Sequence, residues 1–293
     1  PDRRRRDARN GARARLLVQT LHVTRFGFRR EELPANLSLA LGSGELTPWA
    51  LVAGYAVIAN GGYKVEPYFV GRITNGDGTE VYRAEPATVC RDCESGPVDA
   101  EGEPVDIAAL SAMKDKAPGR IASRVADAAN IWIMNSILQD VIKFGTGVQA
   151  RALGRKDLAG KTGTTNDQKD AWFTGFNTRI VTTVWMGFDR VAPLGKRETG
   201  AQAALPVWMD YMRDALADVP ESVLETPPGV VTVRIDPDTG LLAGANNPNA
   251  IFESFRENEV PGRGDDGGGS RVEAGGEAAE TNPGGTALPE QIF

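Results

Sequence analysis

Two short runs lie close together in this sequence, K-T-G-T-T at residues 161–165 and D-A-W-F-T-G-F at residues 170–176. Residues 157–164 alternate in character from one residue to the next, which is typical of a short strand whose side chains point to its two faces in turn. Residues 171–176 and 179–188 are rich in Trp, Phe, Ile, Val and Thr, which predicts two further strands joined by a tight link. Together the three runs predict an antiparallel block led by the Lys-Thr-Gly strand.

The side chains of the leading strand suit acyl transfer. Lys161 and Gly163 share one face of this strand, whereas Leu158 and Thr162 share the other. An ammonium attracts a carboxylate, and a glycine lets a substrate carbonyl or a peptide backbone approach the strand edge. The N–H of Thr164 can serve as an oxyanion donor. K-T-G is one of three motifs that serine acyltransferases use, beside S-x-x-K and S-x-N.

The longer string K-T-G-T-T-N-D, with D-A-W-F-T-G-F after it, resembles the transpeptidase domain of class A (bifunctional) penicillin-binding proteins. R-F-G-F at residues 25–28, L-A-L-G-S-G-E-L-T-P at 39–48 and A-N-G-G-Y at 59–63 are similar to the same family. The resemblance covers residues 25–261. It implies an α+β fold of the penicillin-binding protein and serine β-lactamase type, with an antiparallel sheet flanked by helices, incomplete at its N-terminal side.

The resemblance also implies a function in peptidoglycan (cell wall) synthesis. The family crosslinks stem peptides through an acyl-enzyme on the S-x-x-K serine, and β-lactams acylate the same serine. By this resemblance Lys161 and Thr162 bind a substrate or β-lactam carboxylate, Gly163 permits close approach, and the Thr164 N–H lies in the oxyanion hole. The expected location is the periplasmic face of the bacterial inner membrane, in a membrane-anchored parent, with no cofactor.

The S-x-x-K nucleophile has no counterpart in a matching place. Ser111-Ala-Met-Lys114 fits the letters, but it lies downstream of the helix where the family's nucleophile would already have passed, so we interpret it as a coincidence. Ser43 stands between two glycines, as in a nucleophile elbow. The only histidine, His22, argues against a Ser-His-Asp triad. We interpret Ser43 as a loop or cap serine and assign no catalytic residue.

Two interpretations of the function remain open. In the first, the chain is part of a fuller transpeptidase that also carries a glycosyltransferase domain, and it is inactive alone. In the second, it is a non-catalytic interaction module that kept the fold and lost the nucleophile. An S-x-x-K motif upstream of Pro1 in the parent gene would discriminate between them.

The two ends of the chain differ from its middle. Residues 1–24 form an Arg-rich leader, in which Ala8-Arg9-Asn10 is the nearest match to S-x-N. Its serine is missing and it lies close to Arg25, so Asn10 belongs either to a degenerate motif or to an unrelated or out-of-frame leader. We expect the ordered core to begin near Arg25. The Arg-rich leader lacks the regular helix and strand patterns that follow it, and such inconsistent local preferences argue against a native fold there. Residues 262–293 are Gly-rich and acidic, which predicts a disordered tail.

Both cysteines, Cys90 and Cys93, lie in a loop-like insert over residues 86–104. A single C-x-x-C suits a redox dithiol, half a zinc site or a local disulfide. Zinc would need two further ligands, and the sequence has no second cysteine pair and no nearby histidine. A redox motif would begin a helix after a strand, whereas this loop is acidic and flanked by Pro and Gly. We expect a local disulfide in an extracytoplasmic setting, with a reduced pair as the alternative.

Composition sets further limits. The 293 residues are 41% apolar, enough for a hydrophobic core, and the net charge of -6 argues against a nucleic-acid partner. The longest apolar run, around residues 48–59, is too short to span a bilayer and predicts a buried helix with Thr47 as its N-cap. No signal peptide is recognisable.

Other patterns predict a hairpin and a strand outside the block, together with three more helices. The hairpin is expected over residues 65–83 and the strand over 230–235. The helices are expected over 105–113, 124–144 and 200–217, the last with Val207, Trp208, Tyr211 and Met212 facing inward. Asp236 and Asp238 lack calcium-loop spacing and are interpreted as turn-capping residues, so no metal site is predicted.

Overall fold

The computed structural model describes residues 22–34, 36–89 and 120–263. The chain divides into two compact units, with the boundary in the sequence between Thr226 and Pro227. The predicted domain of residues 25–261 spans both units, and its boundaries stay a prediction. Several sequence predictions lie outside the described residues: Asn10 and nearly all of the leader, Cys90 and Cys93, the helix 105–113, Ser111 and Lys114, and nearly all of the tail.

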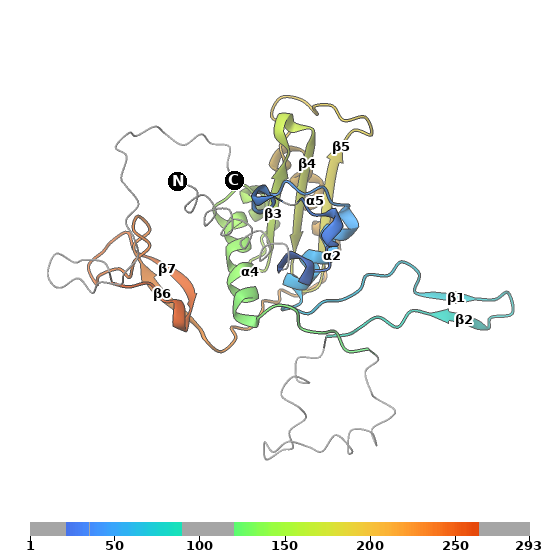
Figure 1. Cartoon of the computed structure of the whole chain (residues 1–293), viewed down its shortest axis with the longest axis horizontal. Coiled ribbons are helices and arrows are strands. Elements are labelled where there is room, and N and C mark those ends of the chain that lie inside the picture. The colour runs from blue at the N-terminus through green and yellow to red at the C-terminus, as the bar shows by residue number, and fades with distance from the viewer. Residues whose placement is uncertain (1–21, 35, 90–119, 264–293) are drawn as a thin grey trace, which may run out of the picture. The chain divides into compact units, whose positions relative to one another are not determined.

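The first unit is built on the predicted antiparallel block (Figure 1). It contains β3 (Ala159–Thr164), β4 (Asp170–Phe176) and β5 (Val181–Gly187), in the order β3-β4-β5. Lys161 pairs with Thr174, and Gly163 pairs with Trp172. The order and direction of the strands are therefore as the sequence predicts, with β3 beginning two residues later than expected and lying at an edge.

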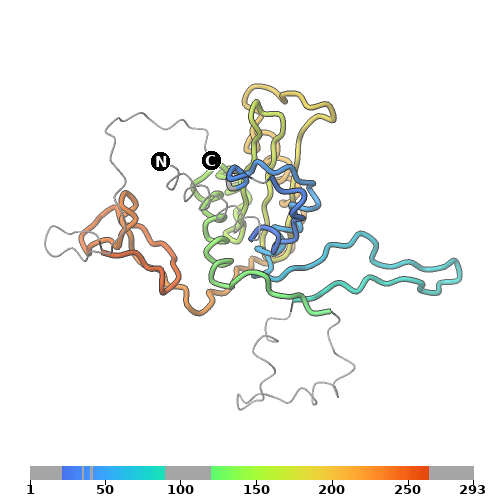
Figure 2. Tube along the Cα trace, viewed as in Figure 1, coloured from blue at the N-terminus to red at the C-terminus, as the bar shows by residue number. Residues whose placement is uncertain are grey.

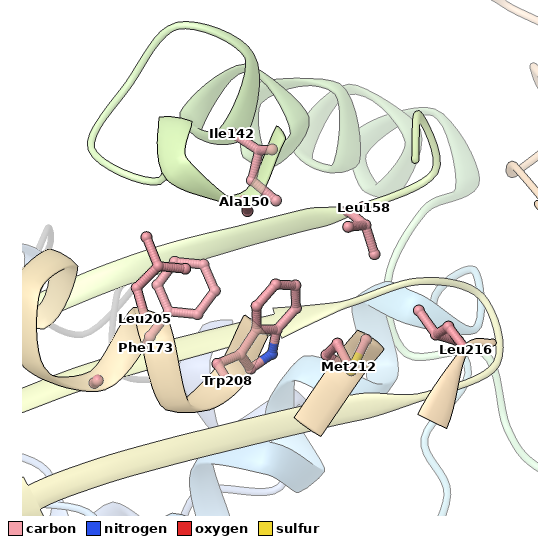
Figure 3. Packing of buried hydrophobic residues seen from close by; sticks show 9 residues of the cluster. Ile142, Ala150, Leu158, Phe173, Leu205, Trp208, Met212 and Leu216 are labelled. Atoms are coloured by element: carbon pink, nitrogen blue, oxygen red, sulfur yellow. The ribbon is translucent and has the colours of Figure 1, made fainter. Parts of the chain in front are cut away.

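One face of this sheet packs against α5 (Leu205–Ala215), which follows the π-helical turn η5 (Gly200–Ala204). Phe173 projects from β4 onto Trp208 of α5, with ring centroids 4.9 Å apart in an edge-to-face arrangement. Figure 3 shows the buried cluster around this pair. Its members are Ile142, Ala150, Leu158, Phe173, Ala204, Leu205, Trp208, Met212 and Leu216.

The opposite face packs against α2 (Pro48–Ala59), and α4 (Ala128–Lys143) packs against the edge strand β3. A second cluster of buried residues lies there: Ala59, Leu138, Ala159 and Phe176. The helix α4 contributes to both clusters, through Leu138 to this one and through Ile142 to the first. The expected α+β arrangement, a sheet flanked by helices, is thus present.

The helix boundaries confirm some expectations and correct others. Thr47 caps α2, because its Oγ1 accepts the N–H of Ala50 at 3.1 Å. The helix α4 begins at Ala128 rather than at residue 124, because the Asp127 carboxylate caps it and accepts the N–H of Asn130. Arg124 itself forms an isolated bridge with Tyr63.

The expected inward face of the last helix was partly wrong. Trp208 and Met212 are fully buried, but Val207 is 49% and Tyr211 53% exposed. Each lies about 100° around the helix from the buried residue that follows it, which takes it off the sheet side. Residues 200–217 also form a π-helical turn followed by α5 instead of one regular helix.

The remaining elements are short. The predicted hairpin is reduced to β1 (Arg72–Thr74) and β2 (Glu80–Arg83), with Ile73 opposite Tyr82. Short helical turns are η1 (Arg30–Glu32), η2 (Leu37–Leu41), η3 (Val148–Leu153), η4 (Asn166–Gln168) and η6 (Glu257–Glu259). Within the described residues, no helix is long and apolar enough to cross a membrane.

The second unit contains an antiparallel pair, β6 (Val230–Ile235) and β7 (Ile251–Arg256). The Asp236 carboxylate accepts the N–H groups of Asp238 and Thr239, as a turn-capping residue does. No cluster of metal-ligating side chains is found in the part of the chain that the structure describes.

Candidate functional site

The backbone of β3 turns a free donor outward at its C-terminal end. The N–H of Thr165 donates to the Asp170 carbonyl at 3.1 Å, so these two residues form a hydrogen-bonded pair. Because such pairs alternate along an antiparallel ladder, Gly163 also bonds β4, whereas the N–H groups of Thr162 and Thr164 point away from it. Thr164 is exposed, and no hydrogen bond from its N–H is found within the described residues.

Lys161 is a half-buried cation on the same face as Gly163. Burial lowers the pKa of its ammonium group below the ordinary value for lysine. Its Nζ donates to the Thr162 carbonyl at 3.1 Å, and no carboxylate among the described residues forms an ion pair with it. A partly desolvated cation without a counterion favours the binding of an anion.

Thr162 lies on the opposite face from Lys161. Its hydroxyl oxygen is 2.7 Å from the hydroxyl of Thr146, in the Gly145-Thr146-Gly147 loop that follows α4. The carboxylate site predicted at Lys161 and Thr162 thus stays a prediction, with the Thr162 hydroxyl engaged by a second threonine. Sequence reasoning missed Thr146, since no spacing rule links it to the K-T-G motif.

Gly200 contacts the site from the sheet face that carries α5. Its N–H donates to Thr164 Oγ1 at 3.0 Å. A Cβ at this buried position would lie 2.3 Å from the Trp172 carbonyl oxygen and 2.6 Å from that of Gly163, closer than real contacts allow. The sequence indicated only that a helix begins near this residue, so its contact with the K-T-G strand was not foreseen.

Residues 25–204 match the family model described as the penicillin-binding protein transpeptidase domain. The chain belongs to this family. It is 47% identical to penicillin-binding protein 1A of Pseudomonas aeruginosa over 256 residues, which cover 82% of this chain and 31% of that protein. Penicillin-binding protein 1A of Vibrio cholerae is 38% identical over 261 residues, with the same two coverages. The chain spans 31% of the length of each of these two relatives.

A solved structure, penicillin-binding protein 1A from Haemophilus influenzae, superimposes with a TM-score of 0.72 at 35% identity. The match covers 85% of this chain and 37% of that one. The resemblance and the fold class inferred from the K-T-G strand and its flanking motifs are therefore confirmed. The chain has the penicillin-binding protein transpeptidase fold.

In this transpeptidase-family chain, two tryptophans lie beside the K-T-G strand. Trp172 is opposite Gly163, and Trp185 is opposite Trp172, with indole centroids 6.1 Å apart. The Trp185 indole N–H donates to Asp170 Oδ1 at 2.8 Å. Since Gly163, Trp172 and Trp185 share the face of Lys161, the pair forms one wall beside the cation.

Ser43 is exposed and accepts a hydrogen bond from the Ser38 hydroxyl at 2.8 Å. The Ser38 hydroxyl also lies 2.5 Å from the Oδ1 of Asn36, which caps η2, so its single proton serves one of these two acceptors at a time. His22 packs its ring on Phe26, with centroids 5.8 Å apart. These contacts agree with the interpretation of Ser43 as a loop serine.

Proposed function

We propose that this chain supplies the substrate-binding edge of a penicillin-binding transpeptidase, which crosslinks peptidoglycan stem peptides in cell wall synthesis. The parent protein would act at the periplasmic face of the bacterial inner membrane. The observation that carries the proposal is a half-buried Lys161 without a counterion among the described residues. It lies on the edge strand β3, near the exposed Thr164, whose N–H points away from β4.

A stem peptide or a β-lactam would lie along this edge. Lys161 would attract its carboxylate, with Thr162 as the neighbouring polar group that the resemblance assigns to the same carboxylate. Gly163 carries no side chain at the point of approach, so a carbonyl can come close to the strand. The Thr164 N–H would then donate to that carbonyl, whose oxygen becomes negative when a nucleophile attacks it.

Acylation itself needs an activated serine oxygen beside a base. Neither Ser43 nor the Ser111–Lys114 pair has the position that the family uses, and Ser43 is bonded to another serine. We therefore place the acylated serine in the parent protein. The isolated chain would bind a β-lactam reversibly through one charge-assisted contact, with an affinity in the millimolar range or weaker.

Incubation of the 293-residue chain with a fluorescent penicillin, followed by denaturing electrophoresis, should give no labelled band. The expected reason is that the sequence carries no S-x-x-K serine in the place that the family uses. A band that disappears on Ser43→Ala or Ser111→Ala would contradict this expectation. It would assign the acyl-enzyme to the chain itself.

Reversible binding of the same fluorescent penicillin, followed by anisotropy, should depend on Lys161. We expect Lys161→Ala to weaken it by about tenfold or more, since a hydrogen bond to a charged group is lost. Lys156→Ala, at an exposed lysine before β3, is the matched control and should leave binding unchanged. Because burial lowers the pKa of Lys161, binding should weaken as the pH rises toward that lowered pKa. Equal losses for the two variants would contradict the proposed role.

A non-catalytic interaction module is the second candidate, favoured by the lack of an S-x-x-K serine in a matching place. The sequence upstream of Pro1 in the parent gene separates the two proposals. An S-x-x-K motif there supports the enzyme, and a parent without it supports the module.

A further inference from the structure

Neighbouring atoms lie close to the Gly163 backbone on both faces of the sheet. On one face, a Cβ at Gly163 would lie 3.2 Å from the Cβ of Trp172. On the other, a Cβ at Gly200 would lie 2.6 Å from the Gly163 carbonyl oxygen and 3.1 Å from its nitrogen. The absence of a side chain at Gly200 lets the backbones of β3 and η5 come this close.

The Thr164 side chain is held by the same contact. Its Oγ1 accepts the Gly200 N–H at 3.0 Å, on the side of the strand opposite Lys161. Because Gly200 is buried against β3 and β4, a shift of its N–H would also shift the backbone of Gly163. The position of the Thr164 N–H therefore depends on where η5 begins.

Two loops lie next to each other at one end of the sheet (Figure 2): the turn between β3 and β4, and the segment between β5 and η5. Gln168, in the turn between β3 and β4, accepts the Leu194 N–H on its carbonyl at 2.9 Å and the Arg197 N–H on its side-chain oxygen at 3.1 Å. The Arg197 carbonyl in turn accepts the Thr199 N–H at 2.8 Å, one residue before Gly200. These hydrogen bonds and the short backbone stretches between them link Gln168 through Arg197 to Gly200, whose N–H donates to Thr164 Oγ1.

Backbone conformation singles out the same loops. Asp167, Gln168 and Arg197 have φ values of 61°, 53° and 70°, and they are the non-glycine residues with positive φ within the described ranges. Left-handed conformations are unfavourable for such residues and persist where surrounding contacts hold them. The contacts of Gln168 are contacts of this kind.

We propose that Gly200, held by the Gln168 loop, is a positioning residue for the Thr164 N–H. This inference rests on the proposed use of that N–H as an oxyanion donor. Such a donor stabilises a developing charge best when its direction is fixed before the charge arrives. Gly200 fixes it by seating η5 on the Gly163 backbone and by bonding the Thr164 hydroxyl.

The first test needs no ligand and uses amide hydrogen exchange followed by NMR on the 293-residue chain. The Gly200 amide should be protected in the wild type and in Thr164→Ser, which keeps the acceptor. In Thr164→Val, which keeps the shape and removes the acceptor, it should exchange about tenfold faster. Equal protection in both variants would overturn the hydrogen-bonded contact.

The second test titrates benzylpenicillin and follows the Thr164 amide signal. We expect a downfield shift in the wild type and a loss of that shift in Gly200→Ala, with affinity lower by about tenfold. Gly175→Ala is the matched control, since its Cβ would lie 2.5 Å from the Trp208 ring and it destabilises the core without touching Thr164. The control should keep the shift at its wild-type size.

The outcomes separate the two proposals. A wild-type Thr164 amide that does not respond to benzylpenicillin would overturn the proposed function, and with it the use of this peptide group. Gly200→Ala with a wild-type response would overturn the positioning role alone. If Gly200→Ala does not fold, Thr164→Val supplies the same comparison, because it releases the Gly200 N–H without adding an atom to the sheet.

Discussion

Trp208→Ala should lower the free energy of unfolding by about 3 to 5 kcal/mol, as expected for the removal of a large buried aromatic side chain. Trp208 is 0% exposed, packs edge-to-face on Phe173 and donates its indole N–H to the Gly175 carbonyl at 3.2 Å. Its ring fills the space that the missing side chain of Gly175 leaves, and alanine would leave a cavity there. Urea unfolding followed by far-ultraviolet circular dichroism measures the change.

Tyr211→Ala is the matched control on the same helix. Its side chain is 53% exposed, so we expect a change within about 0.5 kcal/mol. A similar loss for both variants would contradict the assignment of the Trp208 side of α5 to the core.

Asp157→Ala is expected to cost about 3 to 5 kcal/mol, because it leaves the partly buried Arg155 guanidinium without its carboxylate and removes the acceptor of the Asn177 and Ser222 N–H groups. The Asp157 side chain is 0% exposed, and Arg155 donates to both of its carboxylate oxygens at 2.9 and 2.8 Å. The side chain of Asn177 and the N–H of Ser222 donate to the same carboxylate. The group therefore joins the beginning of β3 to the β4–β5 link and to the segment after α5.

The same carboxylate predicts a pH dependence. Burial raises the pKa of Asp157, but the hydrogen bonds from Arg155, Asn177 and Ser222 outweigh it, and the net pKa is lowered. Because the pKa of Asp157 is lower in the folded than in the unfolded state, the carboxylate stabilises the fold at pH values above its unfolded-state pKa. This stabilisation is lost as the pH falls through the folded-state pKa. The difference between wild type and Asp157→Ala should thus shrink below about pH 4.

Asp210→Ala is the control for this charge. It removes an exposed ion pair with Arg213 on α5, where the side chains are 75% and 57% exposed, and should cost less than about 1 kcal/mol. Equal pH profiles for wild type and Asp157→Ala would contradict the proposed role of the buried carboxylate.

The sequence by itself determined the strand block, the family and the K-T-G edge. Strand period and composition are local properties, so residues 157–188 could be assigned from their own pattern. The motifs allowed the family to be recognised, because many residues at fixed spacing rarely agree by chance. Thr47 marked a helix end for a similarly local reason, since capping acts within one turn.

Tertiary structure alone decided which distant residues meet at that edge. Thr146 reaches Thr162, and Gly200 reaches Thr164, across separations of 16 and 36 residues that no periodicity encodes. The exposure of Val207 and Tyr211 likewise depended on how α5 lies on the sheet, because an apolar side chain is buried only where another element covers it. Contacts of this kind arise from packing between elements, and the pattern within one element does not contain them.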